Sequence, residues 1–299
     1  MLDNQTARSI PLRKPIWIRT KLAGGGLYGR TDLAVHGGLL HTVCEEAKCP
    51  NRSECWSRGT ATFMLLGDVC TRACGFCAVK NGRPTFHETD EPRRVADAVA
   101  AMNLKYVVLT SVNRDDLPDG GVGVFADTLR ELRRRWPGIG VEFLTPDFRN
   151  CQEKAIHGVH DALAGLPEGA NRTLVWGHNV ETVPRLYRQV RKGSKYERSL
   201  ALLEAVARLA AVETKSALML GLGETREEVV EVLADLRARG VRRVSLGQYL
   251  QPTLHHLPVL RYLPPDEFAD YELVARGLGF TWVKAGPLVR SSYYAEEQL

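Results

Sequence analysis

The chain has 299 residues and a formal net charge of +5, with 44% hydrophobic and 25% charged residues. The length suits one large domain or two modest ones, and the composition is that of an ordinary globular protein. No apolar run approaches the roughly 20 residues of a membrane-spanning helix, and residues 1–14 lack the apolar stretch of a secretory signal. We therefore predict a cytoplasmic protein. The modest charge excess is not gathered into a basic tail, so we expect no nucleic-acid partner and no membrane partner.

The first forty residues are rich in glycine, proline and basic residues, and we expect them to form an irregular arm around a larger domain. After Cys55, short apolar and β-branched runs predict six strands, separated by helical patterns at intervals of about 30 to 40 residues. The predicted strands are Thr62–Gly67, Lys105–Ser111, Gly140–Thr145, Arg172–Gly177, Thr214–Gly221 and Arg243–Leu250. This alternation is typical of βα units and a parallel sheet. Because six units are too few for a closed eight-fold barrel, the predicted fold class is α/β, a partial (βα)6 barrel of the TIM type.

Polar residues lie at the carboxyl ends of all six predicted strands. In barrel-like α/β folds the loops at these ends meet at one mouth, where ligands bind. We therefore expect cofactor contacts from a set of five residues: Asn113, Asp115, Glu142, Asn179 and Glu181. Each of these side chains would also suit a helix cap or a loop brace. The pattern names candidates and does not select among them.

The chain has seven cysteines, and six of them lie between positions 44 and 77. In a reducing compartment such a cluster indicates metal binding rather than disulfides. Cys70, Cys74 and Cys77 have CxxxCxxC spacing directly after a predicted strand. Three thiolates on one tight loop can hold three irons of a cubane cluster and leave the fourth iron without a protein ligand. Such an open metal position can accept a cofactor or a substrate.

A second triplet, Cys44, Cys49 and Cys55, precedes the first. By itself its CxxxxCxxxxxC spacing would fit a zinc knuckle. Beside the first motif it indicates a second, auxiliary iron–sulfur cluster. Cys151 stands apart from both triplets and is predicted to be a reduced, partly buried thiol.

The Cys70–Cys77 loop, placed after the first strand of a six-fold βα repeat, resembles that of the radical S-adenosylmethionine (SAM) superfamily. The upstream triplet and the C-terminal motif Arg290-Ser291-Ser292-Tyr293 make the chain similar to the lipoyl synthase family. The resemblance runs from about Trp17 to Glu297 and includes residues 109–121, 142–147, 178–182, 214–216 and 247–252. Two departures are Tyr294, where the family usually has histidine, and Ala217, where it usually has glycine.

The resemblance implies a sulfurtransferase with two [4Fe-4S] clusters and SAM. Such an enzyme inserts two sulfur atoms, at C6 and C8 of a protein-bound octanoyl-lysine, with a 5′-deoxyadenosyl radical as the agent that removes hydrogen. Catalysis and metal binding are then assigned to Cys70, Cys74, Cys77 and Ser292, and the auxiliary, sacrificial cluster to Cys44, Cys49, Cys55 and Ser292. We favour Ser292 over Ser291 as the ligand, because in an extended segment the two side chains would point in opposite directions.

The resemblance also implies partners. These are octanoylated lipoyl carrier domains, such as the glycine cleavage H protein and the E2 subunits of 2-oxoacid dehydrogenases, and an electron donor such as flavodoxin or ferredoxin.

We expect three parts in the chain: 1–58 with the auxiliary cysteines, 59–280 as the barrel, and 281–299 with the Arg-Ser-Ser-Tyr motif. Two alternatives remain open from the residues: another two-cluster radical enzyme, such as a methylthiotransferase or a molybdopterin-pathway cyclase, or a zinc-stabilised binding module without turnover.

Overall fold

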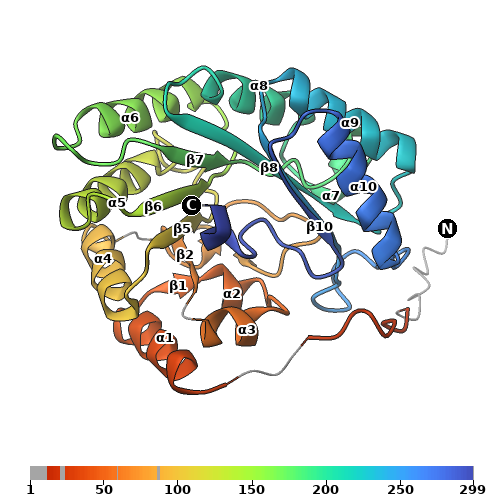
Figure 1. Ribbon diagram of the computed structural model, residues 1–299, viewed down its shortest axis with the longest axis horizontal. Helices are drawn as coiled ribbons and strands as arrows, with labels where there is room; N and C mark the ends of the chain where they lie inside the picture. The colour runs from red at the N-terminus through yellow and green to blue at the C-terminus, as the bar shows by residue number, and fades with distance from the viewer. Residues whose placement is uncertain (1–11, 21–23, 59, 86–87, 299) are drawn as a thin grey trace, which may run out of the picture.

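A curved, mostly parallel sheet of eight strands forms the centre of the protein (Figure 1). The computed structural model describes residues 12–20, 24–58, 60–85 and 88–298. In spatial order the strands are β1 (His41–Thr42), β2 (Thr62–Leu65), β5 (Tyr106–Ser111), β6 (Gly140–Leu144), β7 (Leu174–Gly177), β8 (Val212–Leu220), β9 (Arg243–Gln248) and β10 (Trp282–Gly286). Only β1 is antiparallel to its neighbour. β1 and β10 are the two ends of the hydrogen-bonded order, so the sheet is a partial barrel, as predicted.

Helices cover the outer face of this arc of strands, and the C-terminus lies inside it (Figure 1). The outer helices are α4 (Glu91–Met102), α5 (Val122–Arg135), α6 (Gln152–Ala164), α8 (Tyr196–Val206), α9 (Arg226–Ala238) and α10 (Pro265–Gly277). The remaining helices are α1 (Gly26–Gly37), α2 (Val43–Glu46), α3 (Arg52–Ser57), α7 (Tyr187–Val190) and two short 3₁₀ helices, η1 (Pro184–Leu186) and η2 (Ala295–Gln298). Among the helices that the structure describes, none is both long enough and apolar enough to cross a bilayer.

The strands form where the sequence places apolar side chains on both faces, as a parallel sheet covered by helices requires. Every residue of β2 and of β7 is buried. Phe125 of α5 packs edge to face on Phe143 of β6, with ring centroids 5.0 Å apart, a geometry that adds about 1 kcal/mol to simple burial. Such contacts fix the helices against the sheet and hold the strand ends in place.

All six predicted strands are confirmed, as β2 and β5 to β9. Two features differ from the prediction. The arm expected to be irregular contains the three-turn helix α1, although residues 1–11 of that arm lie outside the described part. Residues 282–286 form a seventh parallel strand, β10, paired with β9. The predicted boundary at residue 59 also falls on a residue that is not described.

Candidate active site

The Cys70–Cys77 loop leaves the barrel at the carboxyl end of β2. It is closed by a small two-stranded sheet of β3 (Val69–Cys70) and β4 (Lys80–Asn81). Within the loop, the Cys77 amide donates to the Cys74 carbonyl at 3.2 Å. The structure therefore places the three predicted thiols on one short turn.

Two other loops hold this turn from outside. The amide of Gly75 donates to the carbonyl of Val190 at 2.9 Å, and the amide of Leu257 donates to the Gly75 carbonyl at 3.0 Å. A Cβ at Gly75 would lie about 3 Å from both Leu257 and the backbone oxygen of Gln189, so only glycine permits this approach. The ring of His256 hydrogen-bonds the carbonyl of Cys77 at 2.9 Å.

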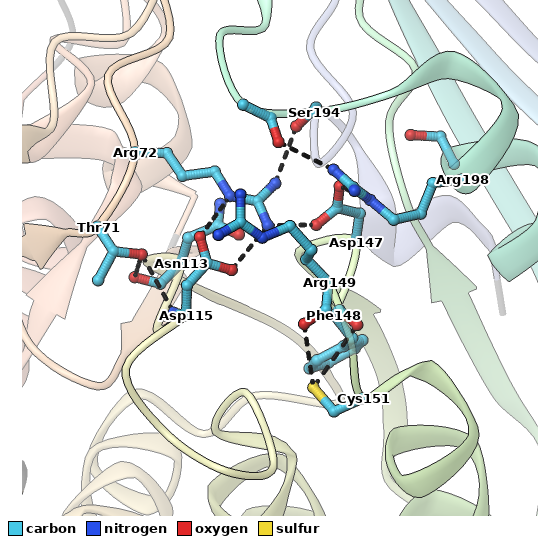
Figure 2. Close-up of polar contacts among 12 residues, drawn as sticks. Thr71, Arg72, Asn113, Asp115, Asp147, Phe148, Arg149, Cys151, Ser194 and Arg198 are labelled. Carbon is cyan, nitrogen blue, oxygen red and sulfur yellow. Dashed lines mark hydrogen bonds and ion pairs between the residues drawn. The ribbon is translucent and has the colours of Figure 1, made fainter.

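Arg72, inside the CxxxCxxC motif, connects the loop to the rest of the mouth (Figure 2). Its guanidinium donates two hydrogen bonds of 2.7 Å to Asp115 and lies 2.7 Å from Asp147. It also donates to the hydroxyl of Ser194 at 2.9 Å. Arg198 donates to the second oxygen of Asp147 at 2.8 Å. Although burial raises the pKa of Asp147, these two arginines hold it well below its usual range. No pattern in the sequence predicts this network, apart from the arginine within the motif.

The second triplet is carried by short helices at the open side of the barrel. Cys44 lies on α2, Cys55 lies on α3, and Cys49 lies in the turn between them, where its amide donates to the Cys44 carbonyl at 3.1 Å. Lys48, just before Cys49, has a positive φ of 52°. Such short helices are not stable by themselves, so tertiary contacts must fix these three cysteines.

The C-terminal segment supplies some of those contacts. The side-chain amide of Asn51 donates to the Leu288 carbonyl at 2.7 Å. The hydroxyls of Tyr293 and Tyr294 both donate to one carboxylate oxygen of Glu54, at 3.1 and 2.7 Å. Tyr294, one of the two departures from the family pattern, therefore binds the helix that carries Cys55.

The serine motif is a turn and not an extended segment, because the Tyr293 amide donates to the Arg290 carbonyl at 3.0 Å. The reason for preferring Ser292 was therefore wrong. Both Ser291 and Ser292 are half-buried and line the same cavity as the cysteines. The structure brings both serines to the site and leaves the choice between them open.

One cavity of about 690 Å³ is shared by the Cys70–Cys77 loop, the second cysteine triplet and the serine turn. Both cysteine triplets and both serines line it. Its described lining contains five cationic side chains, of Arg72, Lys80, Arg191, Lys192 and Arg290, and one carboxylate, of Glu181. The cavity is therefore suited to anionic groups. Arg191 was not predicted from the sequence, since nothing in the local pattern distinguishes it from a surface arginine. Arg290, in contrast, belongs to the Arg290-Ser291-Ser292-Tyr293 motif.

Burial makes three of the cysteine thiols in this cavity harder to ionise. Burial raises the pKa of Cys44 and Cys74 to about 11 and that of Cys77 to about 12. Backbone amides are directed at several of the sulfurs: the Asn113 amide donates to the Cys70 sulfur at 3.3 Å, and backbone hydrogen bonds lower the pKa of Cys44 and Cys77 in part. Hydrogen bonds to sulfur are typical of iron–sulfur sites. No disulfide bond joins the cysteines in the described part of the chain.

Three of the five predicted cofactor contacts reach the cavity, namely Asn113, Asn179 and Glu181. The other two are not among its lining residues. Asp115 is held by Arg72, and Glu142 is buried in an ion pair with Lys215 at 2.9 Å.

Glu181 has a positive φ of 67°, and its carboxylate accepts a hydrogen bond from Asn179 at 3.1 Å. Burial raises the pKa of Glu181, so a cationic ligand would favour its charged form.

A sequence model of the Radical SAM superfamily matches residues 64–236. Among solved structures, *Streptococcus suis* SuiB bound to precursor peptide SuiA has a TM-score of 0.55 at 13% identity, over 79% of this chain and 50% of that chain. Methylornithine synthase (PylB) has a TM-score of 0.53 at 12% identity, over 88% of this chain and 79% of that chain. These likenesses concern the fold alone. Together with the cysteine loop and the family match, they define a radical SAM enzyme.

Two curated relatives carry the assignment further. The lipoyl synthase of *Methylococcus capsulatus* is 53% identical over 289 residues, which cover 96% of this chain and 87% of that protein. The lipoyl synthase of Rubrobacter xylanophilus is 52% identical over 304 aligned positions, which cover 99% of this chain and 92% of that protein. The chain belongs to the lipoyl synthase family. This result favours that prediction over the other two-cluster enzymes and over a zinc-stabilised module.

Proposed function

We propose that this lipoyl synthase inserts sulfur at C6 and C8 of an octanoyl chain that is amide-linked to a lysine of a carrier domain. The observation that carries the proposal is the single cavity lined by both cysteine triplets. An aliphatic C–H bond offers no proton that a side-chain base can remove at neutral pH, so cofactor chemistry is required.

The donor set of the cavity fits two iron–sulfur clusters. We assign Cys70, Cys74 and Cys77 to a [4Fe-4S] cluster with an open iron for SAM, and Cys44, Cys49 and Cys55 to the auxiliary cluster. Burial raises the pKa of the Cys44, Cys74 and Cys77 thiols, and binding to a cationic metal reverses this effect. When bound, the first cluster and SAM supply the 5′-deoxyadenosyl radical, and the auxiliary cluster supplies sulfur.

The residues of the chain hold and screen these groups. Arg72, Arg191 and Arg290 place positive charge along the cavity, which offsets the negative charge of metal-bound thiolates. We assign Glu181, Asn179 and Asn113 to contacts with SAM. The half-buried carboxylate of Glu181 suits the ammonium or sulfonium group, and the two asparagines can donate or accept hydrogen bonds.

An aliphatic chain needs an apolar wall, and apolar side chains of the cavity supply one. The apolar lining includes Met64, Val108, Leu144, Leu218 and Val289. These side chains line the same cavity as both triplets, so an acyl chain in this cavity would have apolar contacts. A serine of the 290–293 turn completes the auxiliary ligand set. An oxygen ligand is a poorer match than thiolate for a soft iron–sulfur site and is more easily released.

Several finer assignments belong to this proposal. The substrates are octanoylated lipoyl carrier domains, the reductant is a flavodoxin or a ferredoxin, and the reaction takes place in the cytoplasm. The auxiliary ligands come from residues 1–58 and 281–299, on either side of the barrel of residues 59–280.

The test is a mass measurement. Anaerobically reconstituted protein, given SAM, dithionite and an octanoyl-lysine peptide, should add two sulfur atoms to the peptide. SAM cleavage with no sulfur added would contradict the proposal.

Paired variants separate the two cysteine triplets. Cys74→Ala should abolish SAM cleavage, because it removes a ligand of the radical-forming cluster. Cys49→Ala should retain SAM cleavage and lose sulfur insertion, because it removes a ligand of the sulfur-donating cluster. An equal loss of both activities in the two variants would refute the division of roles.

A further inference from the structure

Residues 185–198 concentrate the positive charge of the chain. They contain six basic residues and one acidic residue, while the whole chain has a formal net charge of +5. The rest of the sequence is therefore balanced overall. We call residues 185–198 the basic segment. It includes α7 and the turn that leads into α8.

The basic segment packs directly on the Cys70–Cys77 loop. The carbonyl of Val190 accepts the Gly75 amide at 2.9 Å, and the Ser194 hydroxyl accepts a hydrogen bond from Arg72 at 2.9 Å. Figure 2 shows Arg72 and Ser194 meeting across this contact. Arg198 extends the contact through Asp147, which also binds Arg72. The segment therefore covers the cluster-binding loop from outside.

The basic side chains of the segment fall into two groups. Arg191 is buried, and Arg185 and Arg198 form ion pairs with Glu228 and Asp147. All three make their contacts within the protein. In contrast, Arg188, Lys192 and Lys195 are exposed, and none of the three forms an ion pair with a residue in the described part of the chain.

We propose that Arg188, Lys192 and Lys195 form the docking surface for an acidic protein that delivers single electrons. The proposal rests on the proposed function, in which Cys70, Cys74 and Cys77 hold the cluster that must be reduced. The bound carrier gives up one electron and is oxidised by one unit, and the cluster is reduced by one unit. No atom or proton is transferred.

Two physical arguments favour an electron carrier at this surface. Electron transfer weakens steeply with distance, and the basic segment is in hydrogen-bond contact with the cluster-binding loop. Electron-transfer complexes also have small, transient interfaces, in which complementary charge determines the association rate more than buried area does. An exposed cationic surface with few apolar groups suits such an encounter.

The experiment compares two charge-reversed proteins. The test variant is Arg188→Glu/Lys195→Glu. The control is Lys105→Glu/Arg242→Glu, which makes the same chemical change at two exposed residues near the opposite, amino-terminal ends of β5 and β9. Lys192 is left unchanged because it also lines the cavity. Binding of an oxidised flavodoxin is measured by titration, and SAM cleavage is measured with reduced flavodoxin and, separately, with dithionite.

The test variant should bind flavodoxin at least about tenfold more weakly at low salt, and the difference should shrink at 0.5 M salt as charges are screened. Its flavodoxin-driven cleavage should fall in parallel, and its dithionite-driven cleavage should match that of wild type and control. Equal flavodoxin binding by both variants would overturn the proposal. So would a reversal that spares flavodoxin and instead raises KM for an octanoylated carrier. Failure of dithionite-driven cleavage in the wild type would count against the proposed function itself.

Discussion

Replacing Arg72 with methionine should destabilise the protein far more than replacing an arginine that makes similar contacts at the surface. The Arg72 side chain is 3% exposed and bridges Asp115 and Asp147, and the latter is fully buried. Removing one partner of such a buried pair costs about 3 to 5 kcal/mol. Because Arg198 still binds Asp147 in the variant, we expect the lower end, about 3 kcal/mol.

The matched control is Arg135→Met. Arg135 also bridges two carboxylates, those of Asp97 and Glu131, each at 2.6 Å. Its side chain is 23% exposed and that of Asp97 is 50% exposed. Contacts of this kind are worth about 0 to 1 kcal/mol. The contrast between the two arginines therefore tests burial and not the number of bonds.

Thermal unfolding of the anaerobic, iron-loaded protein measures the difference. At about 2 °C per kcal/mol for a chain of this size, Tm should fall by about 6 °C for Arg72→Met and by less than about 2 °C for Arg135→Met. Arg72→Lys should lie near Arg72→Met, because lysine keeps the charge but lacks the planar fork that reaches two carboxylates. Equal Tm shifts for the two methionine variants would refute the reasoning.

Three further predictions concern the cavity wall and the core. Of Ser291→Ala and Ser292→Ala, one should reduce sulfur product more than SAM cleavage and the other should leave both near wild type; two silent variants would remove serine from the ligand set. In Gly247→Ala the new Cβ would overlap the Val289 carbonyl and displace the serine turn. The iron content should therefore fall from about eight to about four per chain, and an unchanged iron content would contradict this. Burial lowers the pKa of His178 to about 4 in the folded protein. Below pH 6.5 the unfolded protein therefore binds more protons at this residue than the folded protein does. The free energy of unfolding falls as a result, by about 1.4 kcal/mol at pH 5.5. The loss of Tm between pH 7.5 and pH 5.5 should therefore be smaller in His178→Gln, and equal losses would exclude this group as the cause.

The sequence was sufficient for the strands that are buried at most positions. β2 and β5 to β9 are of this kind, and their apolar and β-branched residues predict them. β10 was missed because its burial is uneven: Val283 is buried, while Lys284 is partly exposed and pairs with Glu297. A lysine in a five-residue run hides the strand pattern. β1, β3 and β4 have two residues each, which is too short for any periodic signal.

The site was predictable where chemistry alone selects the residue. The clustering of six cysteines predicts a metal site by itself, whereas arginines and carboxylates occur throughout the chain. The sequence could not show that Arg72 meets Asp147, or that Asp115 is committed to an ion pair and turned away from a cofactor. Those outcomes depend on which loops become neighbours at the barrel mouth. For the same reason the sequence did not reveal that residues 290–293 form a turn.

The two cysteine triplets differ in the sequence separation between the cysteines and the residues that hold them in place. The Cys70–Cys77 loop is closed by β3 and β4, which flank it in sequence. The auxiliary triplet is held by Asn51 and Glu54, whose C-terminal partners lie 237 and 240 residues away. Closing such a distance is slow, because the entropy of the intervening chain is lost before any contact forms. The helices α2 and α3 are too short to persist before then. We therefore expect the contacts of Asn51 and Glu54 with the C-terminal segment to form after the barrel. A triplet that is held in part by hydrogen bonds to one end of the chain suits the sulfur-donating role proposed for its cluster, because those contacts can open while the barrel stays folded.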